Sequence, residues 1–246
     1  LSNDRITYYL QPQVDMETGE IVGAEALTRW IGNDGTLIPP VSFIPTLEES
    51  GFVVTLDKYI WQGVAFWLRK RLDQGLRVVP ISLNVSRVDI LACDVAEHMS
   101  ALAASYNLSP ELMRIEITET AYTGEPEAVD KLTADLHTRG FSTYMDDFGT
   151  GQSTLAMLKN VNVDVIKLDR TFVPVDGDQG RSAQIISSML GMAQSLDLPV
   201  VIEGVETEAQ AQLLRQMGAR YAQGFLYYRP MPAADFEALL DSDGED

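Results

Sequence analysis

The sequence predicts an α/β protein built as one modified (β/α)8 barrel. Eight strand-like runs occur along the chain, and the later ones are separated by helix-like segments at a period of roughly 20 to 35 residues. Strict alternation implies parallel strands, and eight strands in 246 residues suggest a closed barrel. No linker divides the chain. Residues 1–240 are therefore expected to form a single domain, and the acidic tail 241–246 is expected to be disordered.

The N-terminal part departs from simple alternation. The first two strand-like runs, 6–11 and 20–27, are separated by turn residues at 16–19 and are expected to pair as an antiparallel hairpin. The first strand should then run antiparallel to the rest of the barrel. After Pro39-Pro40 we expect a short helix that ends at Gly51 and a long helix over 55–73.

Strands and helices alternate over the rest of the chain. The expected strands cover residues 78–83, 113–117, 141–145, 163–168, 199–202 and 221–225. The expected helices cover residues 89–106, 126–138, 153–159, 182–196, 207–217 and 233–240. This order places each helix after the strand that it would cover in a barrel.

Composition and charge exclude several classes of protein. A net charge of −18 argues against general nucleic-acid or membrane-surface binding, because both need a basic face. The single cysteine, Cys93, excludes an internal disulfide and fits a reducing compartment. No apolar run is long enough to span a bilayer. We expect a cytoplasmic domain, cut from a longer parent chain that is either soluble or membrane-anchored.

Polar residues stand at the ends of seven strand-like runs. One such residue is usually a helix cap, but seven strands that each supply one are not explained by capping. In a barrel these strand ends converge on the C-terminal mouth, where active sites lie. In chain order the residues are Glu25, Asn84, Glu116 with Glu119, Asp146 with Asp147, Lys167 with Asp169, Glu203 with Glu206, and Gln223.

The residue types at this mouth favour phosphate chemistry. Carboxylates with one amide oxygen form a hard ligand set that suits Mg²⁺ or Mn²⁺ rather than zinc. Asp146 and Asp147 could bridge two ions about 3.5 to 4 Å apart, an arrangement that serves in-line attack on phosphorus. Lys167 could orient or deprotonate the attacking water, and Glu203 could share that role. Arg29 supplies a bidentate cation for a phosphate oxygen.

Another reaction fits some of these residues. A barrel with acids and a lysine could abstract a proton beside one Mg²⁺, as enolase-like enzymes do. The adjacent Asp146 and Asp147, together with Arg29, fit a two-metal phosphodiester site better. Cleavage of a phosphate bond would separate the two readings. His98 and His137 lie in helical stretches without a partner at metal-ligand spacing and are interpreted as ordinary helix residues.

The motifs occur in an order that is typical of one family. They are Glu25-Ala-Leu27, Asn84-Val-Ser86, Glu116-Ile-Thr-Glu119, Asp146-Asp-Phe-Gly-Thr-Gly151, Lys167-Leu-Asp169, Glu203-Gly-Val-Glu206 and Gln223-Gly-Phe225. From about Tyr8 to Pro232 the chain resembles the EAL domain, a family of bacterial phosphodiesterases that act on cyclic di-GMP. The resemblance implies a modified (β/α)8 barrel that hydrolyses cyclic di-GMP to linear 5′-pGpG in bacterial signalling.

The resemblance also implies roles for single residues. The first Mg²⁺ or Mn²⁺ would be held by Glu25, Asn84, Glu116 and Asp146. The second would be held by Asp146 and Asp147, with Glu203 nearby. The residues implied to act on the water or support the catalytic site are Lys167, Glu203 and Gln223. Those implied to contact the substrate are Gln11, Thr28, Arg29, Asp147 and Glu206. Glu119 would anchor the loop after Asp147, a loop that leads to a dimer interface in the family and so implies a homodimer.

Some positions differ from the family pattern. Thr28 stands where leucine is common, Gln152 and Thr154 replace tyrosine and serine, and Ile202 replaces alanine. None of these removes a metal ligand or the lysine, so the sequence predicts an active enzyme. The alternative is a receptor for cyclic di-GMP, or an interaction module, without catalysis. Sensory or GGDEF-type domains are expected in the parent chain.

Overall fold

The computed structural model describes residues 5–150, 162–174 and 180–242 and confirms the predicted barrel. Eight strands form a closed ring in the order β1-β2-β4-β5-β6-β7-β8-β9, with β9 returning to β1. Their bounds are β1 Ile6–Asp15, β2 Ile21–Ile31, β4 Ile81–Val85, β5 Met113–Thr118, β6 Thr143–Phe148, β7 Val165–Leu168, β8 Val200–Glu203 and β9 Tyr221–Gln223. β1 is antiparallel to both of its ring neighbours, and the other ring pairs are parallel.

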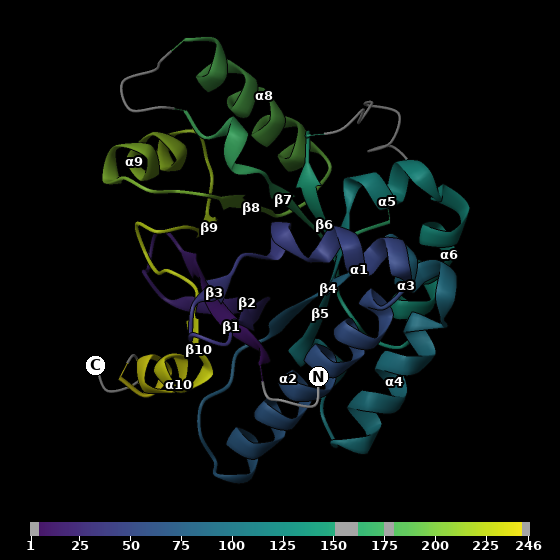
Figure 1. Cartoon of the computed structure of the whole chain (residues 1–246). Helices are drawn as coiled ribbons and strands as arrows, with labels where there is room; N and C mark the ends of the chain where they lie inside the picture. The colour runs from purple at the N-terminus through teal and green to yellow at the C-terminus, as the bar shows by residue number, and fades with distance from the viewer. Residues whose placement is uncertain (1–4, 151–161, 175–179, 243–246) are drawn as a thin grey trace.

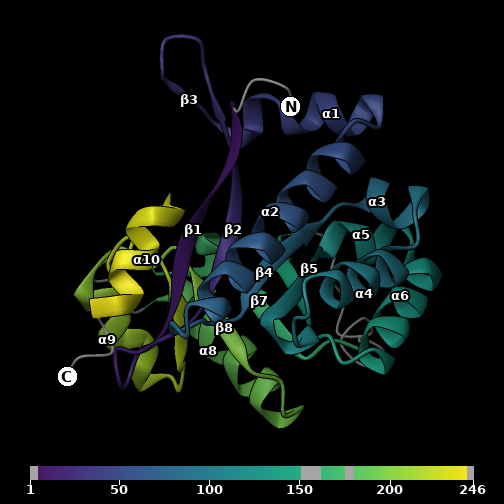
Figure 2. The ribbon, with the colours of Figure 1, turned by 90° about the horizontal axis from the view of Figure 1, so that it is seen from below.

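The β1–β2 hairpin is longer than the sequence pattern predicts. It extends beyond the ring toward the short strand β3 (Leu37–Ile38) and the helix α1 (Ile44–Ser50), as Figure 2 shows. β3 pairs with the end of β2, and the short strand β10 (Met231–Pro232) pairs with β1. Neither two-residue strand has a periodic pattern, so the sequence did not predict them.

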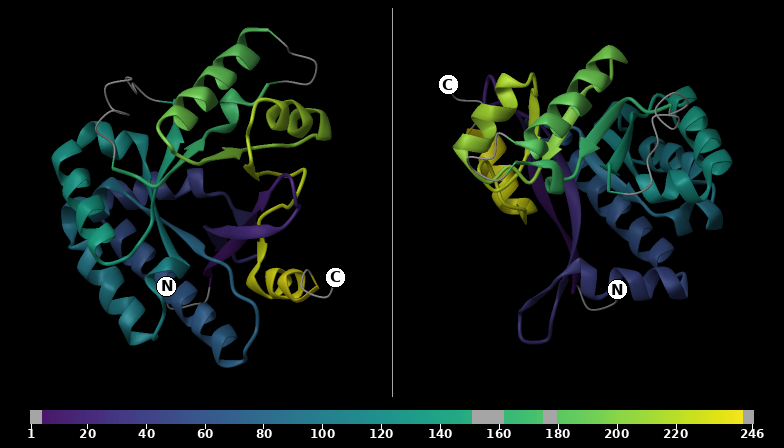
Figure 3. Two further views of the ribbon diagram at one scale, coloured as in Figure 1. Left: turned by 180° about the vertical axis from the view of Figure 1, so that it is seen from behind. Right: turned by 90° about the horizontal axis from the view of Figure 1, so that it is seen from above.

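The helices surround the ring of strands (Figures 1 and 3). Their bounds are α2 Val53–Asp73, α3 Arg87–Ala92, α4 Val95–Ser105, α5 Glu119–Gly124, α6 Pro126–Thr138, α8 Arg181–Ser195, α9 Glu208–Gln216 and α10 Ala233–Ser242. Three single 3-10 turns, η1 Pro40–Ser42, η2 Pro110–Leu112 and η3 Arg170–Phe172, complete the described elements. The expected helix over 153–159, with Gln152 and Thr154, lies outside the described residues. Asp241 and Ser242, which were expected to belong to the tail, end α10. The rest of the expected tail, residues 243–246, also lies outside the described residues.

The single helix predicted over 89–106 was wrong, because the chain forms two helices there. Ser86 caps α3 by accepting a hydrogen bond from the Asp89 amide, and the Asp89 carboxylate accepts one from the Ser86 amide. Asp94 then starts α4 by accepting a hydrogen bond from the Glu97 amide at 2.9 Å. A second N-cap inside the segment ends one helix and begins another.

Side chains on the strands alternate between the helices and the inside of the barrel. On β5, Met113, Ile115 and Ile117 are fully buried in the main core. Inside the ring, a separate small cluster of Tyr144, Val165 and Val201 packs with Tyr221. Two residues further along the strands that carry this cluster, the side chains are polar and belong to the site described below. No described helix is long and apolar enough to cross a membrane.

Candidate active site

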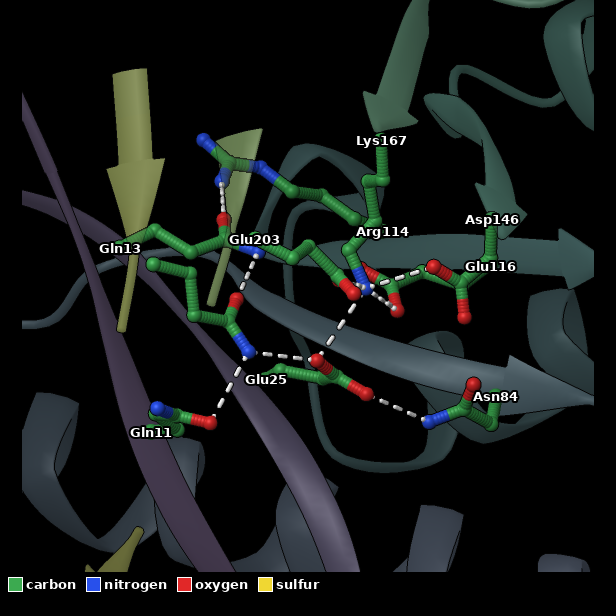
Figure 4. A network of polar contacts seen from close by, with 10 residues as sticks. Gln11, Gln13, Glu25, Asn84, Arg114, Glu116, Asp146, Lys167 and Glu203 are labelled. Atoms are coloured by element: carbon green, nitrogen blue, oxygen red, sulfur yellow. Dashed lines mark hydrogen bonds and ion pairs between the residues drawn. The ribbon is translucent and has the colours of Figure 1, made fainter. Parts of the chain in front are cut away.

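Lys167 lies at the centre of the polar residues that the strands bring to the barrel mouth (Figure 4). Its side chain is fully buried, and its Nζ contacts four carboxylates from four other strands. The distances are 3.1 Å to Glu25 Oε2, 2.7 Å to Glu116 Oε2, 3.0 Å to Asp146 Oδ1 and 2.7 Å to Glu203 Oε1. Residues far apart in the chain therefore form one compact ionic cluster.

The end of β6 allows two neighbouring aspartates to serve the same site. The register between β6 and β7 shifts between Met145 and Phe148, which indicates a bulge. Within it Asp147 adopts a left-handed conformation, with a φ of 56°. Successive side chains of a regular strand point to opposite faces, and this bend removes that restriction. Asp146, Asp147 and Glu203 each offer a carboxylate oxygen, and these atoms lie within 4.8 Å of one another.

Glu25 is held by amide groups as well as by Lys167. Asn84 Nδ2 donates to Glu25 Oε1 at 3.0 Å, and Gln223 Nε2 donates to Glu25 Oε2 at 2.7 Å. Gln223 Nε2 also donates to Gln11 Oε1 at 3.2 Å. The indole N–H of Trp61 donates to the backbone oxygen of Asn84, which fixes the end of β4. The amide of Asn84 thus turns its NH₂ toward Glu25 and leaves its oxygen for another partner.

The electrostatics separate Glu25 from Glu116, Asp147 and Glu203. Burial raises the pKa of Glu25, but Lys167 and the donors on Gln223 and Asn84 outweigh it, so its pKa lies below the ordinary value. Burial would lower the pKa of Lys167, but the surrounding carboxylates, led by Asp146, raise it well above the usual range. Lys167 is therefore a fixed ammonium and Glu25 a fixed carboxylate.

Glu203, Asp147 and Glu116 hold protons more readily than ordinary carboxyl groups do. Burial, with repulsion from Asp146 and Glu25, raises the pKa of Glu203 to about 8 although Lys167 opposes the shift. Burial and the neighbouring Asp146 raise the pKa of Asp147 to about 6. Burial also raises the pKa of Glu116 well above its usual range, against the effect of Lys167. One ammonium does not balance this much negative charge.

The cluster fits divalent cations. Glu25, Glu116, Asp146, Asp147 and Glu203 with Lys167 carry a formal charge of −4 when all are ionised, which two divalent ions would balance. Glu116 Oε1 is buried and accepts no hydrogen bond from the described residues, so it has capacity for a cation. Carboxylates and an amide oxygen are ligands that hard cations prefer.

A pocket of about 180 Å³ opens beside the cluster. It is lined by Gln11, Arg170, Glu203, Gly204, Glu206, Gln223, Gly224 and Phe225. Arg170 and Phe225 were missed by the sequence reading as lining residues. The Gln223-Gly-Phe225 motif contained a signal for Phe225, whereas Arg170 lies two residues after the end of β7 and had none. Arg229 covers the ring of Phe225 at 4.2 Å.

Arg29 and Thr28 lie further along β2. Arg29 Nη1 donates to the backbone oxygen of Thr28 at 2.9 Å, and its guanidinium lies 5.5 Å from the centre of the Tyr9 ring. Burial lowers the pKa of Arg29, and Glu25 opposes that shift, which places both residues in one electrostatic environment. Arg29 is half-buried on the same strand as Glu25, in a position from which it can meet an anion at the mouth.

Glu119 contacts the turn that follows β6. It is fully buried, and its Oε2 accepts a hydrogen bond from the Gly149 amide at 2.7 Å. Gly149 has a φ of 95°, and a Cβ atom there would lie 2.6 Å from the ring of Phe172. Glycine is therefore required at the point where the turn meets η3.

Comparisons with known proteins agree on one family. The family model for the EAL domain matches residues 1–230. The chain is 36% identical over 238 residues to the cyclic di-GMP phosphodiesterase RocR of Pseudomonas aeruginosa. The match covers 96% of this chain and 60% of RocR. It is 32% identical over 242 residues to the bifunctional diguanylate cyclase/cyclic di-GMP phosphodiesterase MucR of the same organism, over 98% of this chain and 35% of MucR. The chain thus spans less than two thirds of either relative.

A solved structure has the same fold. The PaMucR phosphodiesterase in complex with c-di-GMP superposes with a TM-score of 0.89 at 31% sequence identity. The match covers 96% of this chain and 95% of that one. The likeness therefore extends over the whole barrel.

Proposed function

The chain belongs to the EAL domain family, and on that premise we propose that it is a metal-dependent phosphodiesterase that hydrolyses cyclic di-GMP to linear 5′-pGpG. The observation that carries the proposal is the ionic cluster at the barrel mouth. Five carboxylates gather there around one buried lysine, with more negative charge than the lysine can neutralise. A site for two Mg²⁺ or Mn²⁺ ions explains both the residue types and the charge.

The proposed ligands divide into two overlapping sets. Glu25, Asn84, Glu116 and Asp146 would hold the first ion. Asp146 and Asp147 would hold the second, with Glu203 beside them. When bound, such ions supply Lewis acidity at a phosphoryl group and lower the pKa of a bound water. An enolase-like site with a single ion would not need the second set.

The chain's own residues would bind the substrate and move the proton. Arg29 and Gln11 are proposed to hold the phosphate backbone, and Thr28 and Glu206 to flank it. Glu203 lies 2.7 Å from Lys167 Nζ and beside Asp146 and Asp147, and it is proposed to accept a proton from the attacking water. Lys167 donates hydrogen bonds in the same place and would orient that water. Gln223 would hold Glu25 in place through its hydrogen bond to Glu25 Oε2.

The reaction balances as a simple hydrolysis. The water oxygen bonds to phosphorus, and the bond from phosphorus to the 3′ oxygen of the neighbouring ribose breaks. The 3′ oxygen takes up a proton and becomes a hydroxyl group, and the phosphate remains on the 5′ side. Hydrolysis of one of the two diester bonds opens the ring and gives pGpG.

Product formation tests this proposal. Cyclic di-GMP is incubated with the protein in Mg²⁺, in Mn²⁺ and in chelator, and the products are separated by chromatography. We expect pGpG only with metal, and we expect Glu25→Ala to lower its rate by at least about 100-fold, because a ligand is lost. The matched control is Glu17→Ala, which removes an exposed glutamate from the turn of the same hairpin and should leave the rate unchanged. Binding of cyclic di-GMP without any product would contradict catalysis and favour a receptor.

The proposal includes the setting of the domain. We propose a homodimer, a cytoplasmic place of action and further sensory or GGDEF-type domains in the parent chain. The bifunctional relative MucR, of which this chain spans about a third, supports the last point. Sedimentation of the chain with and without metal would test the homodimer.

A further inference from the structure

A row of hydrogen bonds runs through the inside of the barrel beside the ionic cluster around Lys167 (Figure 4). Arg114 Nη1 donates to Gln13 Oε1 at 3.2 Å, and Gln13 Nε2 donates to Gln223 Oε1 at 3.1 Å. Gln223 Nε2 then donates to Glu25 Oε2 at 2.7 Å. Four strands, β5, β1, β9 and β2, supply one residue each. We call these four residues the amide relay.

The relay has a fixed direction. An arginine only donates hydrogen bonds, so Gln13 must turn its oxygen toward Arg114 and its NH₂ toward Gln223. Gln223 must then turn its oxygen toward Gln13 and its NH₂ toward Glu25, which as a carboxylate only accepts. A glutamine side chain has no such preference by itself. The direction of both amides therefore follows from the charged groups at the two ends. Gln11 acts in the same sense on Gln223, because its NH₂ donates to the backbone oxygen of Tyr228 at 3.2 Å and its oxygen accepts from Gln223.

The Arg114 guanidinium fits inside the barrel because residue 23 is a glycine. A Cβ atom on Gly23 would lie 2.2 Å from Arg114 Nη1 and 3.2 Å from Gln13 Oε1. Arg114 Nη2 also donates to the backbone oxygen of Val22 at 3.1 Å, and the guanidinium lies 5.3 Å from the centre of the Tyr144 ring. The arginine that begins the relay is thus held by β2 and β6, although it belongs to β5.

We propose that Arg114 and Gln13 are positioning residues for metal binding, which fix the Gln223 amide so that it presents a donor to Glu25. This inference rests on the proposed function only in taking Glu25 as a metal ligand. With its NH₂ toward Glu25, Gln223 holds one carboxylate oxygen, and Asn84 holds the other. If the Gln223 amide turned over, its oxygen would face two other oxygens, on Glu25 and Gln11.

Gln13→Glu separates direction from packing. The new carboxylate keeps the shape of the side chain, so the barrel interior stays filled. It can still accept from Arg114, and the original hydrogen bond becomes a stronger ion pair. It cannot donate to Gln223, whose amide then loses its partner or turns over. The added negative charge would by itself strengthen cation binding. Weaker binding would therefore report the direction of the amide.

Arg114→Met and Arg114→Lys form the second test. Methionine fills similar space without a donor and frees Gln13 to turn, whereas lysine keeps a donor. The matched control is Arg220→Met. Arg220 also lies 5.3 Å from a tyrosine ring, that of Tyr221, and pairs with Asp15, but it has no bond to the relay. Both methionine variants remove one positive charge, which by itself would strengthen cation binding rather than weaken it. That effect is smaller for Arg220, which is exposed.

The measurement is the dissociation constant for Mn²⁺, from the electron paramagnetic resonance signal of the free ion, beside the melting temperature in chelator. We expect Gln13→Glu and Arg114→Met to weaken Mn²⁺ binding by about tenfold, as loss of an outer partner of a metal ligand does. Arg114→Lys should recover most of the affinity, and Arg220→Met should stay within about twofold of the original chain. The melting temperature of Gln13→Glu should not fall.

Two results would overturn the inference. One is unchanged Mn²⁺ affinity in Arg114→Met. The other is an equal loss of Mn²⁺ affinity in Arg114→Met and Arg220→Met, which would indicate a general effect of removing an arginine and not an effect of the relay. If Gln13→Glu melts at a much lower temperature, the inference is judged from the Mn²⁺ affinities of Arg114→Met and Arg114→Lys. If the original chain itself binds no Mn²⁺, the proposed function fails, and that outcome is distinct from a relay without effect.

Discussion

Lys167 is fully buried, and four carboxylates lie within 3.1 Å of its ammonium group. Bringing so many like charges together in a protein interior is unfavourable unless cations or protons compensate them. Without metal, the compensation is divided between Lys167 and protons, which explains the raised pKa values of Glu116 and Glu203. With metal, ions would replace those protons, so binding should release protons and strengthen as the pH rises.

A second group of buried acids lies away from the barrel mouth, between α2 and α3. Asp57 lies beside Asp89, which is fully buried and also caps α3. Burial, repulsion from Asp89 and the nearby Glu48 raise the pKa of Asp57 from 3.8 to about 9. Asp57 is therefore a protonated donor at neutral pH.

The Asp57 proton makes the stability of the metal-free protein depend on pH. Between pH values of about 4 and 9, the folded chain keeps a proton on Asp57 that the unfolded chain releases. The free energy of unfolding therefore falls as the pH rises through this window, by up to about 1.4 kcal/mol per unit of pH. Asp57→Asn supplies an uncharged donor at every pH. Its stability should exceed that of the original chain by an amount that grows from pH 5 to pH 8, so its slope against pH should be shallower.

Denaturant unfolding in chelator at pH 5, 6.5 and 8 measures this slope. Asp130→Asn, on the exposed face of α6, is a control that should leave the slope as it is. Equal slopes in the original chain and Asp57→Asn would contradict the assignment of the proton, and so would a lower stability of Asp57→Asn at pH 8.

Single residues of the site were predictable where an acidic, amide or lysine side chain interrupts or ends an apolar run, even though Glu25 itself lies within β2. Glu25, Asn84, Glu116, Asp146 and Lys167 each follow or end an apolar run, and the structure brings all five together. Gln13 and Arg114 were not predictable. They lie inside strands, and their partners depend on the register of β1 and on which side chains cross the barrel. The absence of a side chain at Gly23 has meaning only once that crossing is known.

At the scale of elements, the end of β6 and the turn after it decide the second ligand set. The bulge turns Asp147 into the site, and Glu119 on α5 holds the Gly149 amide two residues later. This contact is a charge-assisted hydrogen bond in a buried place, worth about 1.5 to 3 kcal/mol. The position of Asp147 therefore depends on a residue from a neighbouring element.

Glu119→Ala should loosen this turn and weaken the second metal site. We expect kcat for cyclic di-GMP to fall by about 10- to 100-fold at low Mn²⁺ and to recover in part at high Mn²⁺, because the ligand remains in the chain. The control is Glu125→Ala, which removes a glutamate that pairs with Arg87 at the end of the same helix. A kcat within twofold of the original chain at every Mn²⁺ concentration would contradict a role for Glu119 in holding the turn.

The elements themselves were predictable where periodicity is strong. The long helix α2 and strands β5 and β7 lie close to their predicted ranges. β4 begins at Ile81 rather than at residue 78, since Pro80 has no amide hydrogen for the sheet. The helix α5 was missed, because its six residues directly follow a strand and are too short for a periodic signal. Its Thr118 cap was the available clue.

At the scale of the whole molecule, closure of the barrel creates the site. β1 pairs with both β2 and β9, so the first and last strands of the ring meet, and Gln11 and Gln223 come within 3.2 Å. The chain as a whole carries a net charge of −18, which repels an anionic substrate. Divalent ions at the mouth and nearby arginines would reverse the field at the proposed nucleotide site.

The number of Mn²⁺ ions bound per chain tests the central claim most directly, because it requires no assumption about substrate. Equilibrium dialysis with increasing Mn²⁺ should give two ions per chain at saturation, and Asp147→Asn should give one, since Asp147 belongs only to the second ligand set. A value of two for the original chain would show that the carboxylate cluster is a two-metal site. Saturation at one ion or at none would contradict it, and the −4 charge at the barrel mouth would then have to be balanced by protons.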